Sequence, residues 1–266
     1  MQYPIVFFGS SPFSVIVLQK LLDSKRYTLD AVITTPDKPA ERGLKLTPNP
    51  VKVLAQQHSL PIFTDIKDFL ASTLPQDSVG LIAAYGRIVG PKTLSKLNDH
   101  IYGIHPSLLP KYRGPSPLQK QILDGVSDSG VTVFKIDLSE DTGPIVATHK
   151  AVIQDTDTWI TLGNRLFSLG TDLFLSLDPE HLSLTPQIES EATYTKKLTR
   201  QSGFIPWEKF KSTLDSNPTL LDRRHRALQG WPGVWSLNPQ KKRVKLVALA
   251  PPTVVVEGGS PVLWEQ

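Results

Sequence analysis

The first 125 residues alternate between short apolar runs and amphipathic stretches. The apolar runs contain few polar residues, which is typical of strands buried on both faces of a parallel sheet. We expect such strands at residues 5–8, 29–34, 61–63 and 79–84, and a central strand from residue 101. The stretches between and after them predict helices at 12–22, 50–58, 66–72, 91–97 and 117–124. This alternation of strands and helices predicts a mostly parallel, doubly wound α/β sheet of the Rossmann-like kind.

The pattern changes after residue 125. Residues 130–136 and 144–153 alternate between apolar and polar positions, which predicts an antiparallel extension of the sheet. Residues 158–177 predict one long helix, because their apolar residues recur at helical spacing. The rest predicts an irregular stretch at 182–199, a short helical segment containing Arg223, Arg224 and Arg226, and a small β unit from strands at 244–249, 253–257 and 262–264.

Composition places the chain among ordinary globular proteins and excludes several kinds of site. The chain has 266 residues, enough to bury a full core. It contains no cysteine, which excludes disulfides and thiolate metal sites and fits a reducing, cytoplasmic compartment. The amino-terminal residues form the first predicted strand without a basic lead, so we expect no signal peptide. No apolar run reaches the length of a membrane span.

Charge is distributed unevenly along the chain. Residues 1–195 carry 17 basic and 20 acidic side chains, a net charge of −3. Residues 196–266 carry 12 and 5, a net charge of +7. A basic end on a mildly acidic body suggests a polyanionic partner, and a solvated basic face without a partner is the equally common alternative.

One histidine, His105, stands at the end of the predicted central strand. In an open α/β sheet, chemistry is usually found just beyond the carboxyl ends of the strands. A histidine there can serve as an acid or a base, although a hydrogen-bonded structural histidine is the commoner outcome for such a position. The loop that follows favours the chemical role, because residues 106–114 read Pro-Ser-Leu-Leu-Pro-Lys-Tyr-Arg-Gly.

The segments His-Pro-Ser-Leu-Leu-Pro-x-Tyr-Arg-Gly at 105–114 and Asp-x-Gly-Pro-Ile at 141–145 resemble the folate-dependent formyltransferases. Within that family the chain is most similar to the enzymes that act on methionyl-tRNA. The resemblance extends from Ile5 to about Trp207 and more weakly to Trp235. It implies a formyltransferase catalytic domain at 1–188, a linker at 189–203 and a basic, reduced β-rich domain at 204–266. It also implies 10-formyltetrahydrofolate as the co-substrate.

The resemblance assigns the catalytic roles. His105 is expected to stabilise the oxyanion formed during acyl transfer, and Asp141 to face His105, orient it and help to accept a proton. From the residues alone, an aspartate in the turn at 138–144 is usually solvated. The family pattern has an asparagine two residues before the histidine, where this chain has Gly103. Because glycine supplies no donor, we predict reduced activity that Gly103→Asn restores.

Two further groups of residues are expected to bind the substrates. The resemblance places folate against residues that precede and follow the central strand, namely Tyr85, Gly86, Arg87, Ile88, Val89, Ser107, Leu108, Leu109 and Pro110. Ordinary sheet-edge packing is the alternative for each of them. The loop at 35–48 resembles the segment by which the tRNA enzymes hold the acceptor end, so Lys38, Arg42 and Lys45 are expected to contact phosphates. A solvated loop is the alternative there.

We therefore expect a monomeric cytoplasmic enzyme whose partners are folate and initiator tRNA charged with methionine. An amino-sugar or other small-amine formyltransferase is the first alternative. A catalytically silent homologue that binds tRNA or folate is the second, and Gly103 motivates it. The remaining histidines show no ligand spacing, so we predict no metal site; they are His58, His100, His149, His181 and His225.

Overall fold

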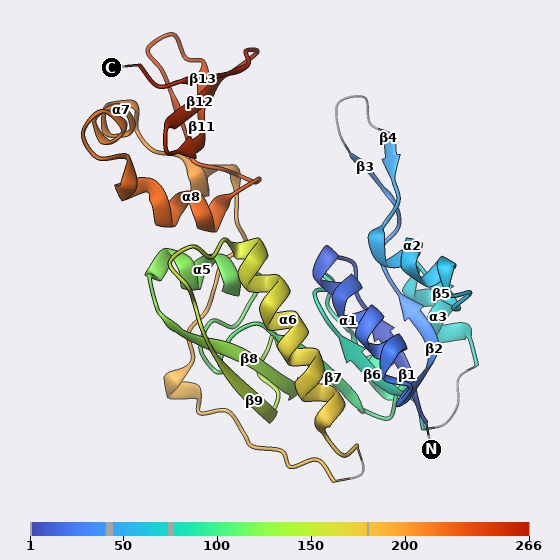
Figure 1. The fold of residues 1–266 in the computed structure, drawn as a ribbon. Coiled ribbons are helices and arrows are strands. Elements are labelled where there is room, and N and C mark those ends of the chain that lie inside the picture. The colour runs from blue at the N-terminus through green and yellow to red at the C-terminus, as the bar shows by residue number, and fades with distance from the viewer. Residues whose placement is uncertain (1, 41–44, 74–76, 180, 266) are drawn as a thin grey trace. The chain divides into compact units, whose positions relative to one another are not determined.

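The computed structural model describes residues 2–40, 45–73, 77–179 and 181–265. The chain divides into two compact units (Figure 1). The first comprises Met1–Pro115, Asp128–Val152 and Gly163–Tyr194, and the second comprises Ser116–Ser127, Ile153–Leu162 and Thr195–Gln266. Each unit has its own sheet and its own apolar cluster, so each is described separately.

A seven-stranded sheet forms the centre of the first unit, in the order β5-β2-β1-β6-β7-β8-β9. Its strands are β1 (Tyr3–Phe8), β2 (Tyr27–Ile33), β5 (Ile62–Phe63), β6 (Val79–Ile82), β7 (Ile101–His105), β8 (Asp128–Lys135) and β9 (Ile145–Val152). The strands from β5 to β7 run parallel, whereas β8 pairs antiparallel with both β7 and β9. The predicted fold class, including the antiparallel extension, is therefore confirmed.

Helices cover both faces of this sheet (Figure 1). They are α1 (Pro12–Ser24), α2 (Pro50–Gln57), α3 (Ile66–Ala71), α4 (Pro91–Lys96) and α6 (Trp159–Ser176), whose first turn is grouped with the second unit. Side-chain caps begin two of them. Ser11 forms a capping box with Ser14 before Pro12, and the Asn49 side chain accepts hydrogen bonds from two main-chain N–H groups of α2.

Alternation along β1 divides the core of the first unit. Val6 and Phe8 belong to the cluster on the face of α3 and α4, where Phe8 meets the fully buried Phe69 edge to face. Burying a phenylalanine of this kind contributes about 1.5–3 kcal/mol. On the face of α1 and α6, Phe13 stacks on Phe167 with ring centroids 5.2 Å apart. The sheet is thus packed on both sides, as its nearly continuous apolar strands predict.

The second unit contains a four-stranded antiparallel sheet in the order β10-β11-β12-β13. Its elements are α5 (Pro117–Asp124), α7 (Trp207–Ser216), α8 (Asp222–Leu228), β10 (Trp235–Leu237), β11 (Arg243–Leu249), β12 (Pro252–Val256) and β13 (Pro261–Leu263). Phe210 and Leu214 of α7 pack with Val244, Leu246 and Val254 of the sheet to form its core. Helix α5 packs against α8.

Four elements differ from the prediction. The predicted loop at 36–48 contains a two-stranded hairpin, in which β3 (Lys38–Ala40) pairs with β4 (Lys45–Thr47). Three-residue strands are too short to produce a pattern, and Pro39 weakens the strand signal further. Helix α7 and strand β10 were also absent from the prediction. Among the described residues, no helix is long and apolar enough to cross a membrane.

Candidate active site

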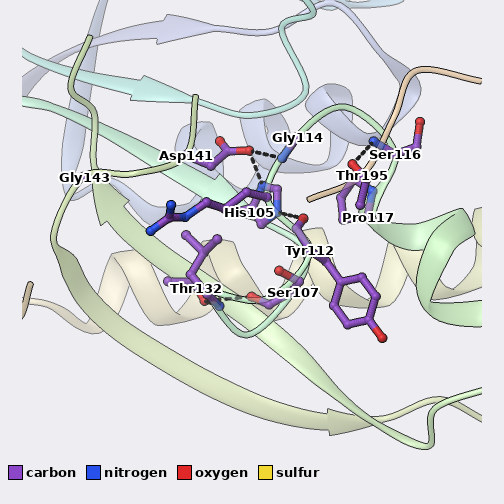
Figure 2. Close-up of polar contacts among 12 residues, drawn as sticks. His105, Ser107, Tyr112, Gly114, Ser116, Pro117, Thr132, Asp141, Gly143 and Thr195 are labelled. Carbon is purple, nitrogen blue, oxygen red and sulfur yellow. Dashed lines mark hydrogen bonds and ion pairs between the residues drawn. The ribbon is translucent and has the colours of Figure 1, made fainter. Parts of the chain in front are cut away.

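His105 ends β7, between the neighbouring strands β6 and β8. Its side chain is buried, and its two ring nitrogens face different oxygens (Figure 2). Nε2 lies 2.9 Å from the main-chain oxygen of Tyr112, and Nδ1 lies 3.4 Å from Oδ2 of Asp141. A carbonyl oxygen only accepts, so Nε2 carries a proton. The nitrogen with the looser contact, Nδ1, is therefore the one free to engage a substrate.

Asp141 lies in the turn between β8 and β9, and a second contact fixes its carboxylate. The main-chain N–H of Gly114 donates to Oδ2 at 2.7 Å, so one carboxylate oxygen faces both the glycine N–H and the histidine ring (Figure 2). The backbone of Asp141 is left-handed, with φ of 57°. The structure thus brings the two predicted catalytic side chains together, one from the end of β7 and the other from the turn between β8 and β9.

The loop after His105 is held by its own hydrogen bonds and by β8. The Ser107 hydroxyl donates to the main-chain oxygen of Lys111 at 2.6 Å. The Thr132 hydroxyl of β8 donates to the main-chain oxygen of Ser107 and accepts from the N–H of Leu109 (Figure 2). These bonds fix the path from β7 to Tyr112, whose carbonyl holds the histidine ring.

Arg113 and Gln187 form a support that sequence analysis did not assign. Arg113 is almost fully buried, and its guanidinium donates to Gln187, Glu189 and the Tyr194 hydroxyl. The Gln187 amide nitrogen donates to the main-chain oxygens of Asp141 at 2.8 Å and of Gly143 at 2.7 Å. Gln187 therefore connects the buried arginine to the turn that carries Asp141. Arg113 stands in the quoted motif, but Gln187 lies in a stretch without periodicity and carries no signal.

Gly103 is buried two residues before His105, and aromatic packing surrounds it. A Cβ atom at this position would lie 2.6 Å from a ring carbon of Phe134 and 2.8 Å from the end of Ile136. Real Cβ contacts are never that short, so a side chain here requires the ring to move. The same phenyl ring meets His105 edge to face, with centroids 6.3 Å apart. Phe134 therefore occupies the space that a side chain at position 103 would need.

The residues expected to bind folate differ in exposure. Tyr85, Val89, Ser107 and Leu109 are buried, whereas Ile88 is 90% exposed. Gly86 and Arg87 are also exposed, and Leu108 and Pro110 are half-buried. Burial raises the pKa of the Tyr85 hydroxyl, which therefore remains a donor at neutral pH. The segment follows β6, which pairs in parallel with β7, so it begins at the same edge of the sheet as His105. Folate contacts from these residues stay a prediction.

The residues expected to hold tRNA are described only in part. Lys38 and Lys45 belong to the paired backbone of β3 and β4, and Arg42 lies outside the described residues. Within the described part of the chain, no group of three or more histidine, aspartate or glutamate side chains is arranged to hold a metal ion.

Comparison with known proteins finds relatives that match most of the chain. Residues 3–177 match the family model described as formyl transferase. A methionyl-tRNA formyltransferase from Thermus thermophilus is 34% identical over 255 residues, covering 93% of this chain and 80% of the relative. Its counterpart from Roseiflexus castenholzii is 37% identical over 254 residues, covering 91% of this chain and 79% of the relative.

Solved structures show the same fold at low identity. A 4-N formyltransferase from Francisella tularensis aligns with a TM-score of 0.70 at 14% identity, covering 92% of this chain and 97% of that one. A phosphoribosylglycinamide formyltransferase from Bacillus halodurans aligns with a TM-score of 0.51 at 24% identity, covering 65% of this chain and 91% of that one. At these identities the structural likeness concerns the fold alone.

Proposed function

This chain belongs to the formyl transferase family, and from that premise we propose that it transfers the formyl group of 10-formyltetrahydrofolate to the amino group of methionyl initiator tRNA. The observation that carries the proposal is the contact of the buried His105, at the carboxyl end of β7, with the half-buried Asp141. Choosing tRNA as the acceptor is supported by similarity to methionyl-tRNA formyltransferases over more than nine-tenths of the chain.

The first step is attack of the neutral amine on the formyl carbon. A bond forms between the amine nitrogen and that carbon, and the carbonyl electron pair moves to oxygen, which becomes an oxyanion. In its cationic form, with a proton on each ring nitrogen, His105 donates to this oxyanion through Nδ1, because Nε2 already donates to the Tyr112 carbonyl. A donor placed in advance where charge develops accelerates acyl transfer typically by about 10²–10³-fold.

The second step transfers a proton and breaks the bond to folate. The attacking nitrogen must lose a proton, and the carboxylate of Asp141 accepts it directly or through a water molecule. Collapse of the intermediate breaks the bond between the formyl carbon and N10 of the folate, and N10 receives the proton. The Gly114 N–H and Gln187 hold the carboxylate and its turn during the transfer. No covalent enzyme intermediate is required.

Substrate binding follows the assignments made from the sequence. Folate is held by the segment 85–89 and by the loop 107–110, and the acceptor end of the tRNA by Lys38, Arg42 and Lys45. Because Gly103 provides no side-chain donor, the oxyanion has one donor fewer than the family pattern supplies. We therefore expect a transferase that binds folate normally and reacts slowly.

Formylation assays with defined acceptors test the proposal. The purified protein and 10-formyltetrahydrofolate are supplied with charged initiator tRNA, free methionine, or a nucleotide-linked amino sugar, and formylated product is quantified. We expect product only with the charged tRNA. If the amino sugar is formylated in preference to the tRNA, the acceptor is a small amine and the first alternative holds. Folate binding without product from any acceptor would favour the silent homologue, the alternative that Gly103 motivates.

A further inference from the structure

The second unit contains a basic pocket of about 230 Å³ that the active site does not use. It is lined by Arg200, Gly230, Trp231, Pro232, Trp235, Arg243 and Lys245. Three cationic side chains and two indole rings thus surround one small space. Among the ion pairs of the described residues, none involves Arg200, Arg243 or Lys245. Glu257 accepts a hydrogen bond from the main-chain N–H of Arg243 at 3.4 Å.

Hydrogen bonds and packing form the walls of the pocket. The Trp235 indole N–H donates to the main-chain oxygen of Arg200 at 2.9 Å, and its buried ring packs against Phe204. Lys245 donates to the main-chain oxygen of Gly230 at 2.8 Å and crosses Gly233, where a Cβ atom would lie 2.3 Å from its Cε. Gly233 has φ of 73°, so both its backbone and the space above it require glycine.

Trp231 differs from the other pocket residues, because its large apolar side chain is 57% exposed. An indole ring at the edge of a cationic pocket offers a flat stacking surface next to positive charge. Nucleic-acid-binding proteins combine these two features to hold unstacked bases beside their phosphates. A duplex is too wide for a space of this volume. A single base with its phosphate is a flat ring joined to an anion, which matches an indole ring beside cationic side chains.

We propose that this pocket binds one unstacked nucleotide of an RNA chain, with the base on Trp231 and the phosphate beside Arg200, Arg243 and Lys245. The inference rests on the proposed function, because it takes the RNA to be the tRNA substrate. It adds a recognition element that a basic surface alone would lack, since stacking requires a nucleotide outside a helix.

Binding measurements with three probes and matched variants test the pocket. The probes are an initiator tRNA transcript, an eight-nucleotide oligouridylate and an eight-base-pair RNA duplex. The variants are Trp231→Ala, Trp231→Phe, Arg243→Ala and the control Lys209→Ala, which removes one exposed positive charge outside the pocket. Circular dichroism checks that each variant is folded.

We expect Trp231→Ala to weaken oligouridylate and tRNA binding by about fivefold to a hundredfold, the usual range for one lost stacked base. Trp231→Phe restores most of the loss, and duplex binding changes little. Arg243→Ala lowers the slope of log affinity against log salt by about one. The inference is overturned if the wild type does not bind oligouridylate, or if Trp231→Ala weakens it no more than Lys209→Ala.

The two proposals fail in distinguishable ways. If the protein formylates methionyl-tRNA and Trp231→Ala leaves RNA affinity unchanged, the pocket proposal is wrong and the proposed function stands. If oligouridylate binding depends on Trp231 but charged tRNA is not formylated, the proposed function is wrong and the pocket is a single-stranded RNA site.

Discussion

The phenyl ring of Phe134 fills the space beside Gly103, 2.6 Å from where a Cβ atom would stand. The phenyl ring of Phe134 therefore fits where it lies only because residue 103 has no side chain. The same ring contacts His105 edge to face, so the packing at position 103 also affects the catalytic histidine. The prediction that an asparagine at 103 restores rate consequently depends on Phe134.

We expect Gly103→Asn combined with Phe134→Leu to increase kcat by up to about a hundredfold, because it adds an oxyanion donor and makes room for it. Gly103→Asn alone should gain less and lower Tm, since the ring must be displaced from a packed core. Phe134→Leu alone is the control for the lost ring. Steady-state kinetics and thermal melts measure both effects. Equal gains from the single and the double variant would show that the ring does not obstruct the site.

Asp141→Asn should reduce kcat by about 10²–10⁴-fold while folate affinity stays within about twofold, because the amide cannot accept the proton. The side-chain oxygen can still accept from the Gly114 N–H, so the turn is retained. Glu140→Gln, which changes the neighbouring acid, is the control. Single-turnover formylation and folate titration separate the two quantities. A reduction below tenfold would remove Asp141 from the proton transfer.

Gln187→Ala should reduce kcat by about tenfold to a hundredfold with KM little changed. The variant leaves the carbonyls of Asp141 and Gly143 without their amide donor, and displacement of a reacting group by about 1 Å has effects of this size. Tyr194→Phe, which removes one partner of Arg113 without touching the Asp141 turn, is the control. Assays run well below Tm exclude simple unfolding. An unchanged kcat would mean that Gly114 alone positions the carboxylate.

Stability should depend on Glu189 at low pH. Hydrogen bonds from Arg113 and Tyr194 hold the pKa of Glu189 below its ordinary value of 4.5. A group with a lowered pKa in the folded state stabilises the fold above its unfolded pKa, and this contribution is lost as pH falls through the folded value. Wild type should therefore exceed Glu189→Gln in Tm at pH 7, and the difference should shrink below about pH 4.5. A constant difference across this window would exclude the linkage.

Affinity for tRNA should fall steeply with salt, because Lys38, Arg42 and Lys45 and the pocket residues Arg200, Arg243 and Lys245 are expected to contact phosphates. Arg42→Ala should weaken binding and lower the salt slope by about one. Lys67→Ala, which removes a positive charge elsewhere in the first unit, serves as the control. Filter binding at several salt concentrations measures both values. A flat salt response would contradict phosphate recognition.

Strands and helices long enough to show a repeating pattern of apolar residues could be predicted from the sequence. Buried parallel strands leave continuous apolar runs, and α6 leaves a helical stripe, so the sheet and its antiparallel extension were predictable. His105 and Asp141 were expected to meet because the segments that carry them resemble the paired motifs of the formyltransferase family. Short elements such as β3, β4 and β10 span three residues each, too few to produce a period.

Contacts within the site were harder to predict, because they join residues that are distant in sequence and irregular in pattern. Gln187 lies 46 residues beyond Asp141 in a stretch without regular structure, so only the folded chain reveals that it holds that turn. Phe134 looks like any inward-facing strand residue, and its position over Gly103 follows from the pairing register of β7 with β8.

Because the backbone of Asp141 is left-handed, folding and catalysis select different sets of residues at this position. With φ of 57°, the position disfavours most side chains by about 1–2 kcal/mol, while glycine, asparagine and aspartate are tolerated. In a library randomised at 141, folding alone should therefore retain those three residues, and growth that depends on formylation should retain only aspartate. Glutamate carries the same acid but would be lost because it disfavours this backbone conformation. Asparagine and glycine would be folded but inactive, so the amount of folded protein and the formylation activity would diverge most at these two residues.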